Sequence, residues 1–415
     1  LEGVLPVSGC SAESLLADSG AVLQVLREAG QLLDWEGDSI VPSGPEEAAI
    51  DYMERHRKSA SPRALALLLT LRRLYGAGVA RVRRQVQRYS AATEAFVGHF
   101  GPGPVAVGRA PARINILGEH VDYVRYLPTE VLPFASREHD MLILFRPSEN
   151  GLVRGRSTLA WAEPAQFDVA EGPAGTAGAD AGSLDDRWLS YLRETGTPKR
   201  HWINYVKASV FFCLMKHGRL ERGFDFLLDS TVPAAGGASS SSTVVVLSGA
   251  AVRVANGLAL DAAELAEDSA KAEWYIGTRG GNMDHCTMCL ARRQHAVHLN
   301  FGASRAELVP LHRFQYRWVT FFAHPADKGG DVLLQFNERS AVSRLLIPAL
   351  LEELLASRPE LRPRWERAVE TLRTDTEDVE SAQAAQDILE LLPESVTLDQ
   401  VRNRFPAVFE ELERS

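Results

Sequence analysis

Apolar residues recur at helical spacing through most of the first hundred residues. Between Ser11 and Asp34 they lie three and four positions apart, which predicts an amphipathic helix. Ser43 is placed as the N-cap of a second helix that runs to about Arg55. A third helical pattern opens at Ser61 and continues to the glycine–proline break at Gly101–Pro104. The chain is therefore expected to begin with a helical unit, and the arginines of its third pattern are interpreted as a solvated face.

The pattern changes after this break. Strands are predicted where apolar residues alternate or form short runs, at 105–123, 141–147 (MLILFRP), 224–230 (FDFLLDS), 295–301 (HAVHLNF) and 317–325 (RWVTFFAHP). Helical spacing separates them at 201–218 and at 259–277, where Asp261 is the expected N-cap, and dominates again from Gln335 to the end. Strands and helices mix without regular alternation, so the predicted fold class is α+β.

The stretch from Thr231 to Leu247, TVPAAGGASSSSTVVVL, combines two glycines, four serines and an apolar run. If a helix follows, its first N–H groups are unpaired and attract anions, phosphate above all. The stretch then reads as a phosphate loop, although no GxxxxGK[ST] pattern occurs in the chain. A flexible linker is the alternative. The β-branched run Thr243–Val246 favours a strand instead of a helix, so the sequence leaves the next element open.

Composition narrows the choice of partners. The 415 residues allow two or three domains, and the net charge of −9 without a long basic run argues against nucleic acid. No signal peptide and no apolar run long enough to cross a membrane are seen, so a cytoplasmic protein is expected. Cys286 and Cys289 form a lone CxxC, for which two buried thiols on one helix face are favoured over a zinc or redox site.

Three glycine-punctuated segments carry many polar residues: 109–123, the serine-rich stretch and 273–285. The chain here resembles the GHMP small-molecule kinases, and among them the galactokinases. GRAPARINILGEHVDY is similar to the galactokinase signature, PAAGGASSSS to the phosphate loop, and SAKAEWYIGTRGGNMDH to the segment with the catalytic aspartate. HWINYV matches a segment that helps to enclose adenine. The resemblance covers about Val105 to Ile347.

The resemblance implies an ATP- and Mg²⁺-dependent sugar kinase that acts at the anomeric hydroxyl. It implies a role for each matching residue, as follows: catalysis by Asp284, as base or positioning group, and by Arg113; substrate binding by Glu119, His120, Asp122 and Phe336; nucleotide binding by Trp202, Gly236, Gly237, Ser239, Ser240 and Ser241; and Mg²⁺ binding by Ser241 and Glu273. Phosphoryl transfer needs such groups for positioning and charge neutralisation.

Each of these residues also has a plain structural interpretation. Asp284 alone would be a helix N-cap, Arg113 and Glu119 a structural ion pair, Glu273 a surface residue, and Trp202 a core aromatic. The order and spacing of four matches favour the functional interpretation. A catalytically silent sugar and nucleotide sensor, or a GHMP kinase for a different alcohol, are the alternatives.

The sequence departs from galactokinases near the sugar. Arg125 and Tyr126 stand where the family has small residues, His285 replaces a glutamine, and Phe336 replaces a sugar-binding tyrosine. These changes predict that galactose is a poor substrate.

The implied fold is the two-lobed GHMP kinase fold with the active site between the lobes, preceded by the helical extension. The predicted parts are the extension (1–100), an N-terminal lobe with the ATP and sugar motifs (101–302) and a C-terminal lobe (303–415). The third, glycine-rich family motif is expected to be absent from that last part, because no glycine follows Gly330. The oligomeric state is left open.

Overall fold

The computed structural model of the chain describes residues 16–35, 61–76, 78–160, 162–173, 183–233, 236–301, 305–311, 318–319, 330–375 and 377–413. The helix predicted from Ser43 lies outside these residues, and so does most of the strand predicted at 317–325. None of the helices in the described ranges combines the length and the apolar character that a membrane span requires.

The N-terminal unit is helical, as predicted, and has a small core of its own. It contains α1 (Ser19–Trp35), α3 (Pro62–Tyr75) and α4 (Val79–Phe100). Ser61 caps α3 by accepting a hydrogen bond from the Ala64 N–H at 3.2 Å. The pattern predicted as one helix is interrupted at Gly76, whose φ of 99° ends α3. Buried leucine, valine and alanine side chains of the three helices pack together.

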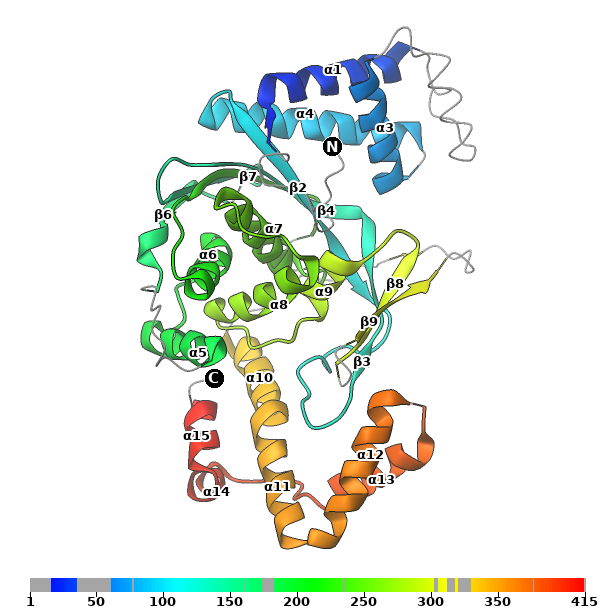
Figure 1. Cartoon of the computed structure of the whole chain (residues 1–415), viewed down its shortest axis with the longest axis vertical. Coiled ribbons are helices and arrows are strands. Elements are labelled where there is room, and N and C mark those ends of the chain that lie inside the picture. Colours follow the sequence, from blue (N-terminus) through cyan, green and yellow to red (C-terminus); the bar gives the residue numbers. More distant parts are fainter. Residues whose placement is uncertain are drawn as a thin grey trace.

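A six-stranded sheet forms the centre of the molecule (Figure 1), in the order β1-β2-β4-β7-β5-β6. Its strands are β1 (Ala17–Asp18), β2 (Pro104–Asn115), β4 (Pro133–Pro147), β5 (Leu152–Ser157), β6 (Ala165–Asp168) and β7 (Phe224–Ser230). All neighbours are antiparallel except β5 and β7. A second sheet has the order β3-β8-β9, formed by β3 (Glu130–Val131), β8 (His295–Asn300) and β9 (Arg305–Pro310).

Helices cover both faces of the large sheet, which explains why Met141–Phe145 of β4 is a continuous apolar run. Leu142 and Leu144 pack with Phe96 of α4 on one face. Ile143 and Phe145 belong to the large core on the other face, together with side chains of α6 and α7. That side also carries α8 and α9. The helices are α5 (Leu184–Thr195), α6 (Ile203–His217), α7 (Ser240–Ala255), α8 (Ala262–Ala272), a 3-10 turn (Glu273–Ile276) and α9 (Met283–Leu290). Asp261 caps α8, as predicted, by accepting from Ala263 and Glu264.

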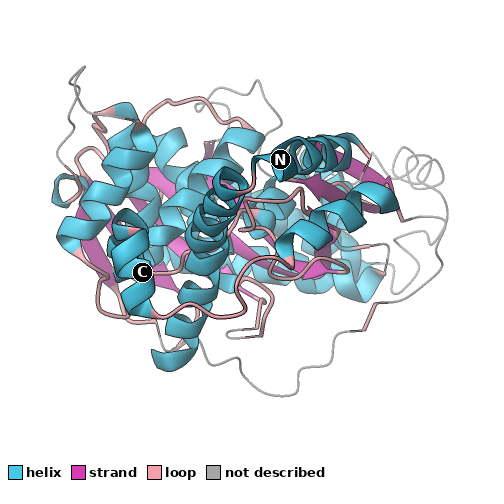
Figure 2. Cartoon of the chain, turned by 90° about the horizontal axis from the view of Figure 1, so that it is seen from below, coloured by secondary structure: helices cyan, strands magenta, loops and turns pink. Residues whose placement is uncertain are grey.

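The described C-terminal part is helical. Its elements are α10 (Gly330–Ala341), a π-helical turn (Val342–Leu346), α11 (Ile347–Ser357), α12 (Arg362–Thr374), α13 (Val379–Leu389), α14 (Leu398–Arg404) and α15 (Pro406–Glu413). α10 and α11 lead away from the sheet region to the other C-terminal helices (Figure 1). Viewed from below, helices lie around the strands (Figure 2). The prediction of an α+β chain in two lobes behind a helical extension is confirmed.

Candidate active site

An arginine and an aspartate from distant parts of the sequence meet at one end of β2. Arg113 Nε donates a hydrogen bond to Asp284 Oδ1, and Ser239 Oγ donates to Asp284 Oδ2 at 2.5 Å. Asp284 lies in the first turn of α9, and Ser239 directly precedes α7. Three of the predicted segments therefore meet at a single carboxylate.

The pairing of β2 with β4 is irregular just before Arg113, the residue that contacts Asp284. In a regular strand Arg109 and Arg113 would share one face, because alternate side chains do so. The pairing is irregular here, because Pro111 pairs with Asp140 but Arg113 pairs with Ala135, so the extra residues lie in β4. Arg109 bonds Asp140 on the α4 side, whereas Arg113 reaches Asp284 on the α9 side.

Asp284 is held in its charged form. Burial by itself would raise the pKa of the carboxyl, but the Arg113 guanidinium and the Ser239 hydroxyl outweigh it, and the pKa lies below the usual range. The side chain keeps 24% exposure, so a reactant can approach it. An ionised, partly accessible carboxylate can accept a proton or position a hydroxyl group.

Arg113 also contacts Glu119, one of the residues predicted to bind the sugar. Its Nη2 lies 3.2 Å from Glu119 Oε1, and Asn115 Nδ2 donates to Glu119 Oε2 at 2.9 Å. The ion pair between Arg113 and Glu119 is thus formed, and it is continuous with the contact to Asp284. Glu119 remains 47% exposed, so it also has surface available to a ligand.

Asp122 is a second carboxylate beside Asp284. Its Oδ2 accepts from the Met283 N–H at 3.3 Å, and a Cβ at Gly281 would lie 2.4 Å from this carboxyl, so only glycine fits there. Burial, followed by the charge of Asp284, raises the pKa of Asp122. The environments of the two carboxyls therefore move their pKa values in opposite directions.

α10 brings Phe336 to the same place from the C-terminal part. The Phe336 ring meets the edges of His120 and Tyr123, with centroids 5.6 and 5.8 Å apart. His120 has a left-handed φ of 60°, which is unusual for a residue other than glycine. The structure thus brings together five of the predicted catalytic and sugar-binding residues with Phe336.

Hydrogen bonds hold α10 against the 277–281 loop. Asn337 Nδ2 donates to the Gly277 carbonyl at 2.7 Å, and Ser340 Oγ donates to the Arg279 carbonyl at 2.6 Å. By contrast, Tyr126 packs against the cluster of C-terminal helices around Leu351. The Tyr126 ring is therefore part of the packing of those helices.

The serine-rich stretch leads into a helix, which settles the open choice at Thr243–Val246. Gly237 has a φ of 70° and Ser239 one of 59°, and no side chain caps the N-terminus of α7. This N-terminus is compatible with a phosphate. The nucleotide roles of Gly236, Gly237, Ser239, Ser240 and Ser241 remain predictions, and Ser239 has an additional contact with Asp284 that the sequence did not indicate.

Glu273 is buried behind this loop. Ser242 Oγ donates to Glu273 Oε2 at 2.9 Å, and His285 Nε2 lies 2.9 Å from the same oxygen. Burial opposes its ionisation, but the contacts with His285 and Ser242 keep the pKa of Glu273 below its usual range. No group of three or more His, Cys, Asp or Glu side chains in the described ranges is arranged as a metal site. A carboxylate and a serine hydroxyl are oxygen donors that fit Mg²⁺, which takes its other ligands from phosphates and water.

Trp202 has the contacts of a core aromatic. Its Nε1 donates to the Glu163 carbonyl at 2.9 Å, and its ring packs on Phe226. Its predicted role beside adenine remains a prediction. Cys286 and Cys289 are free buried thiols on α9, and burial raises the pKa of Cys286 to about 12.

Sequence reasoning did not assign a role to Asn115, Ser242 or Gly281, and it noted His285 only as a replacement. Ser242 belongs to the serine run, but four identical hydroxyls do not reveal which one faces the carboxylate of Glu273. The pair of glycines at 280 and 281 was the available signal for the close approach of Asp122.

Two family models match segments of the chain that contain the candidate active-site residues. The family model of the GHMP kinases N terminal domain matches residues 204–292, which contain the serine-rich stretch, Glu273 and Asp284. The model of the galactokinase galactose-binding signature matches residues 94–147, with Arg113 through Asp122, and begins inside α4. The resemblance to GHMP kinases, and among them to galactokinases, that the sequence indicated is thereby confirmed.

Individual galactokinases are similar to the chain in sequence. A galactokinase of Dictyostelium discoideum is 32% identical over 223 residues, covering 52% of this chain and 40% of the relative. A galactokinase of Chloroflexus aurantiacus is 30% identical over 268 residues, or 62% of this chain and 59% of the relative. The chain thus spans about half the length of these relatives. A crystal structure of Lactococcus lactis galactokinase complexed with galactose aligns at 22% identity and a TM-score of 0.48, over 76% of this chain and 82% of that one.

Proposed function

We propose that the protein is an ATP- and Mg²⁺-dependent sugar kinase that phosphorylates a sugar at its anomeric hydroxyl. The observation that carries this proposal is the ionised Asp284, held between Arg113 and Ser239 at the mouth of the serine-rich loop. Galactokinase relatives and the galactose-binding signature support a sugar as the acceptor.

In this mechanism the nucleotide phosphates lie against the N-terminus of α7, where unpaired N–H groups and the helix dipole favour negative charge. The sugar oxygen attacks the terminal phosphorus, the bond from phosphorus to the leaving oxygen of ADP breaks, and the hydroxyl proton passes to Asp284 or to water held by it. Arg113 keeps Asp284 charged and compensates charge on the transferred group. Ser241 and Glu273 would hold the Mg²⁺, which supplies charge neutralisation on the phosphates when bound.

Glu119, His120, Asp122 and Phe336 form the sugar side of the proposed site. The galactose-binding signature supports a galactose-like acceptor. Phe336 supports a preferred sugar other than galactose, since its ring has no hydroxyl to bond a sugar. Tyr126 does not support this preference, because it packs on the C-terminal helices. Galactose is therefore the reference sugar, and we keep the prediction that another sugar is preferred.

The test is ATP consumption with galactose beside a panel of uronic, amino, deoxy and pentose sugars, followed by phosphorus NMR of the product. A sugar 1-phosphate as the product supports the proposal, and phosphate on another hydroxyl would contradict the anomeric assignment. If no sugar of the panel supports turnover while a nucleotide binds, the kinase proposal fails. A cytoplasmic location and the absence of nucleic-acid partners remain predictions from composition.

A further inference from the structure

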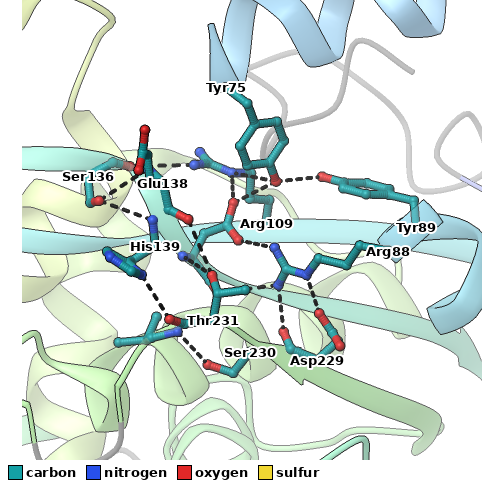
Figure 3. A network of polar contacts seen from close by, with 12 residues as sticks. Tyr75, Arg88, Tyr89, Arg109, Ser136, Glu138, His139, Asp229, Ser230 and Thr231 are labelled. Atoms are coloured by element: carbon teal, nitrogen blue, oxygen red, sulfur yellow. Dashed lines mark hydrogen bonds and ion pairs between the residues drawn. The ribbon is translucent and has the colours of Figure 1, made fainter. Parts of the chain in front are cut away.

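The N-terminal helices are joined to the sheet by a buried carboxylate. Asp140 of β4 is completely shielded from solvent. Its Oδ2 accepts from Tyr75 Oη of α3 at 2.6 Å and from Arg109 Nε of β2, and its Oδ1 lies 2.5 Å from Arg88 Nη1 of α4. Figure 3 shows Tyr75, Arg88 and Arg109 gathered at this point. Three elements therefore converge on one side chain.

The charges at this junction are balanced. Arg88 also bonds Asp229 of β7, through Nε to the carboxylate and through Nη2 to the carbonyl at 3.2 Å. Two arginines thus face two aspartates, Asp140 and Asp229. Removing one member of a buried ion pair leaves its partner uncompensated, so such a network specifies one position of the helices on the sheet.

The main chain of Asp140 continues the connection toward the serine-rich loop. Its carbonyl accepts from the Thr231 N–H at 2.9 Å, and its N–H donates to Thr231 Oγ1 at 3.1 Å. The Thr231 carbonyl also lies 3.0 Å from His139 Nδ1 (Figure 3). Thr231 follows the last residue of β7 and begins the segment that leads to Gly236 and Ser239.

We propose that Tyr75, Asp140 and Thr231 form a positioning relay through which the N-terminal helices set the place of the phosphate loop. The inference rests on the proposed function, because it assigns the loop to a nucleotide. None of the three residues is catalytic. They act through the backbone that carries Gly236, Gly237 and Ser239.

A purely structural anchor would lower stability without changing ligand affinity at temperatures where the protein is folded. A positioning relay must weaken nucleotide binding more than sugar binding, because it leads to the phosphate loop, whereas Glu119, Asp122 and α10 lie on other segments of the chain. The two interpretations can be distinguished by measuring the dissociation constants of the nucleotide and of the sugar.

The first experiment compares Tyr75→Phe with Tyr89→Phe. The Tyr75 hydroxyl bonds Asp140 directly, whereas the Tyr89 hydroxyl lies 3.2 Å from the Tyr75 hydroxyl and meets Asp140 only through it. Calorimetric titration with a Mg²⁺-bound, nonhydrolysable ATP analogue should show about 5-fold or greater weakening for Tyr75→Phe, the lower end of typical coupling between sites. Tyr89→Phe should bind like the wild type.

A second pair keeps the test independent of Tyr75. Thr231→Val retains the shape and the backbone N–H but loses the hydroxyl that receives the Asp140 N–H, and should weaken the nucleotide in the same way. Thr231→Ser restores the hydroxyl and should recover wild-type affinity. The double variant Tyr75→Phe/Thr231→Val should lose less than the product of the two single effects, since both act on one relay.

The inference is overturned if the variants melt at lower temperature but bind the nucleotide as the wild type does. It is also overturned if nucleotide and sugar affinities fall equally. A wild-type chain that binds no nucleotide would instead overturn the proposed function itself, so the two failures are distinguishable.

Discussion

Asp284 retains its charge because a guanidinium and a hydroxyl are already directed at both of its oxygens. We expect Asp284→Asn to lose about 10²- to 10⁴-fold in kcat, the usual contribution of a general base. The nucleotide should still bind, because the loop and α7 are unchanged. The measurement is kcat on the best sugar of the panel, with nucleotide affinity from titration as the control. Near-normal kcat in a folded variant would remove Asp284 from the chemistry.

Ser241 and Ser242 are adjacent hydroxyls with different predicted roles. Ser242 bonds Glu273 directly, whereas Ser241 is the hydroxyl expected on Mg²⁺. Loss of a residue that hydrogen-bonds a metal ligand, as Ser242 does to Glu273, typically reduces metal affinity about 10- to 100-fold. Ser241→Ala and Glu273→Ala should reduce it at least as much. The measurement is the Mg²⁺ concentration for half-maximal activity. If Ser241→Ala and Glu273→Ala both leave it unchanged, the metal lies elsewhere.

Asp122 should make the stability of the fold depend on pH. Burial and the charge of Asp284 raise its pKa in the folded protein. A carboxyl with a raised folded pKa destabilises the fold while it is ionised, and this penalty disappears as the pH falls through that pKa. Asp122→Asn should therefore melt above the wild type at about pH 7 to 8, and the difference should shrink toward about pH 4, where ordinary carboxyls titrate.

A matched control is Asp261→Asn at the N-cap of α8, where aspartate and asparagine are nearly equivalent. Its melting temperature should follow that of the wild type across the same range. A constant difference between Asp122→Asn and the wild type at every pH would contradict the assignment.

Single site residues could be selected from the sequence only where it offers distinct side chains in order. Arg113, Glu119, Asp122 and Asp284 were selected in this way, and the structure brings them together, while their roles stay predictions. The contact of Ser239 with Asp284 could not be found, because it depends on a left-handed backbone angle that serine rarely adopts.

α10 is the element that connects the C-terminal helices to the sugar side. It presents the Phe336 ring to His120 and Tyr123. We expect Phe336→Tyr to raise kcat/KM for galactose, because an unpaired buried hydroxyl costs about 1–3 kcal/mol, or 5- to 150-fold. The control is a deoxy sugar that lacks the hydroxyl concerned, for which the gain should vanish. An equal gain with both sugars would contradict a new hydrogen bond.

Most elements of the fold could be predicted from periodicity, and the exceptions have physical causes. The run Thr243–Val246 favours a strand locally, yet it lies in α7 because Val245 and Val246 are buried in the cores on that side of the sheet. Burial of apolar surface outweighs the small propensity difference of β-branched residues. The helical pattern predicted near the end of the chain is divided at Phe405 into α14 and α15, because Pro406 cannot continue the preceding turn.

At the scale of the whole molecule, the proposed ligand should stabilise the folded chain. A Mg²⁺-bound, nonhydrolysable ATP analogue at 100 times its dissociation constant stabilises a protein by about 2.7 kcal/mol if only the folded state binds it. We expect a corresponding rise in melting temperature, measured by differential scanning calorimetry. The same analogue without Mg²⁺ should give a smaller rise, and equal rises would contradict a metal-dependent nucleotide site.

The π-helical turn at Val342–Leu346 divides one long rod into two halves that serve different neighbours. Before it, Asn337 and Ser340 are bonded to the 277–281 loop. After it, Leu350 packs with Val401 and Phe409 of the last two helices. A π turn holds one residue more than an α turn, so it offsets the later half by about one position, or 100° around the axis. The number of residues in this segment is therefore itself a determinant of structure. Natural variation here should conserve length, since one deletion would turn one half away from its neighbour.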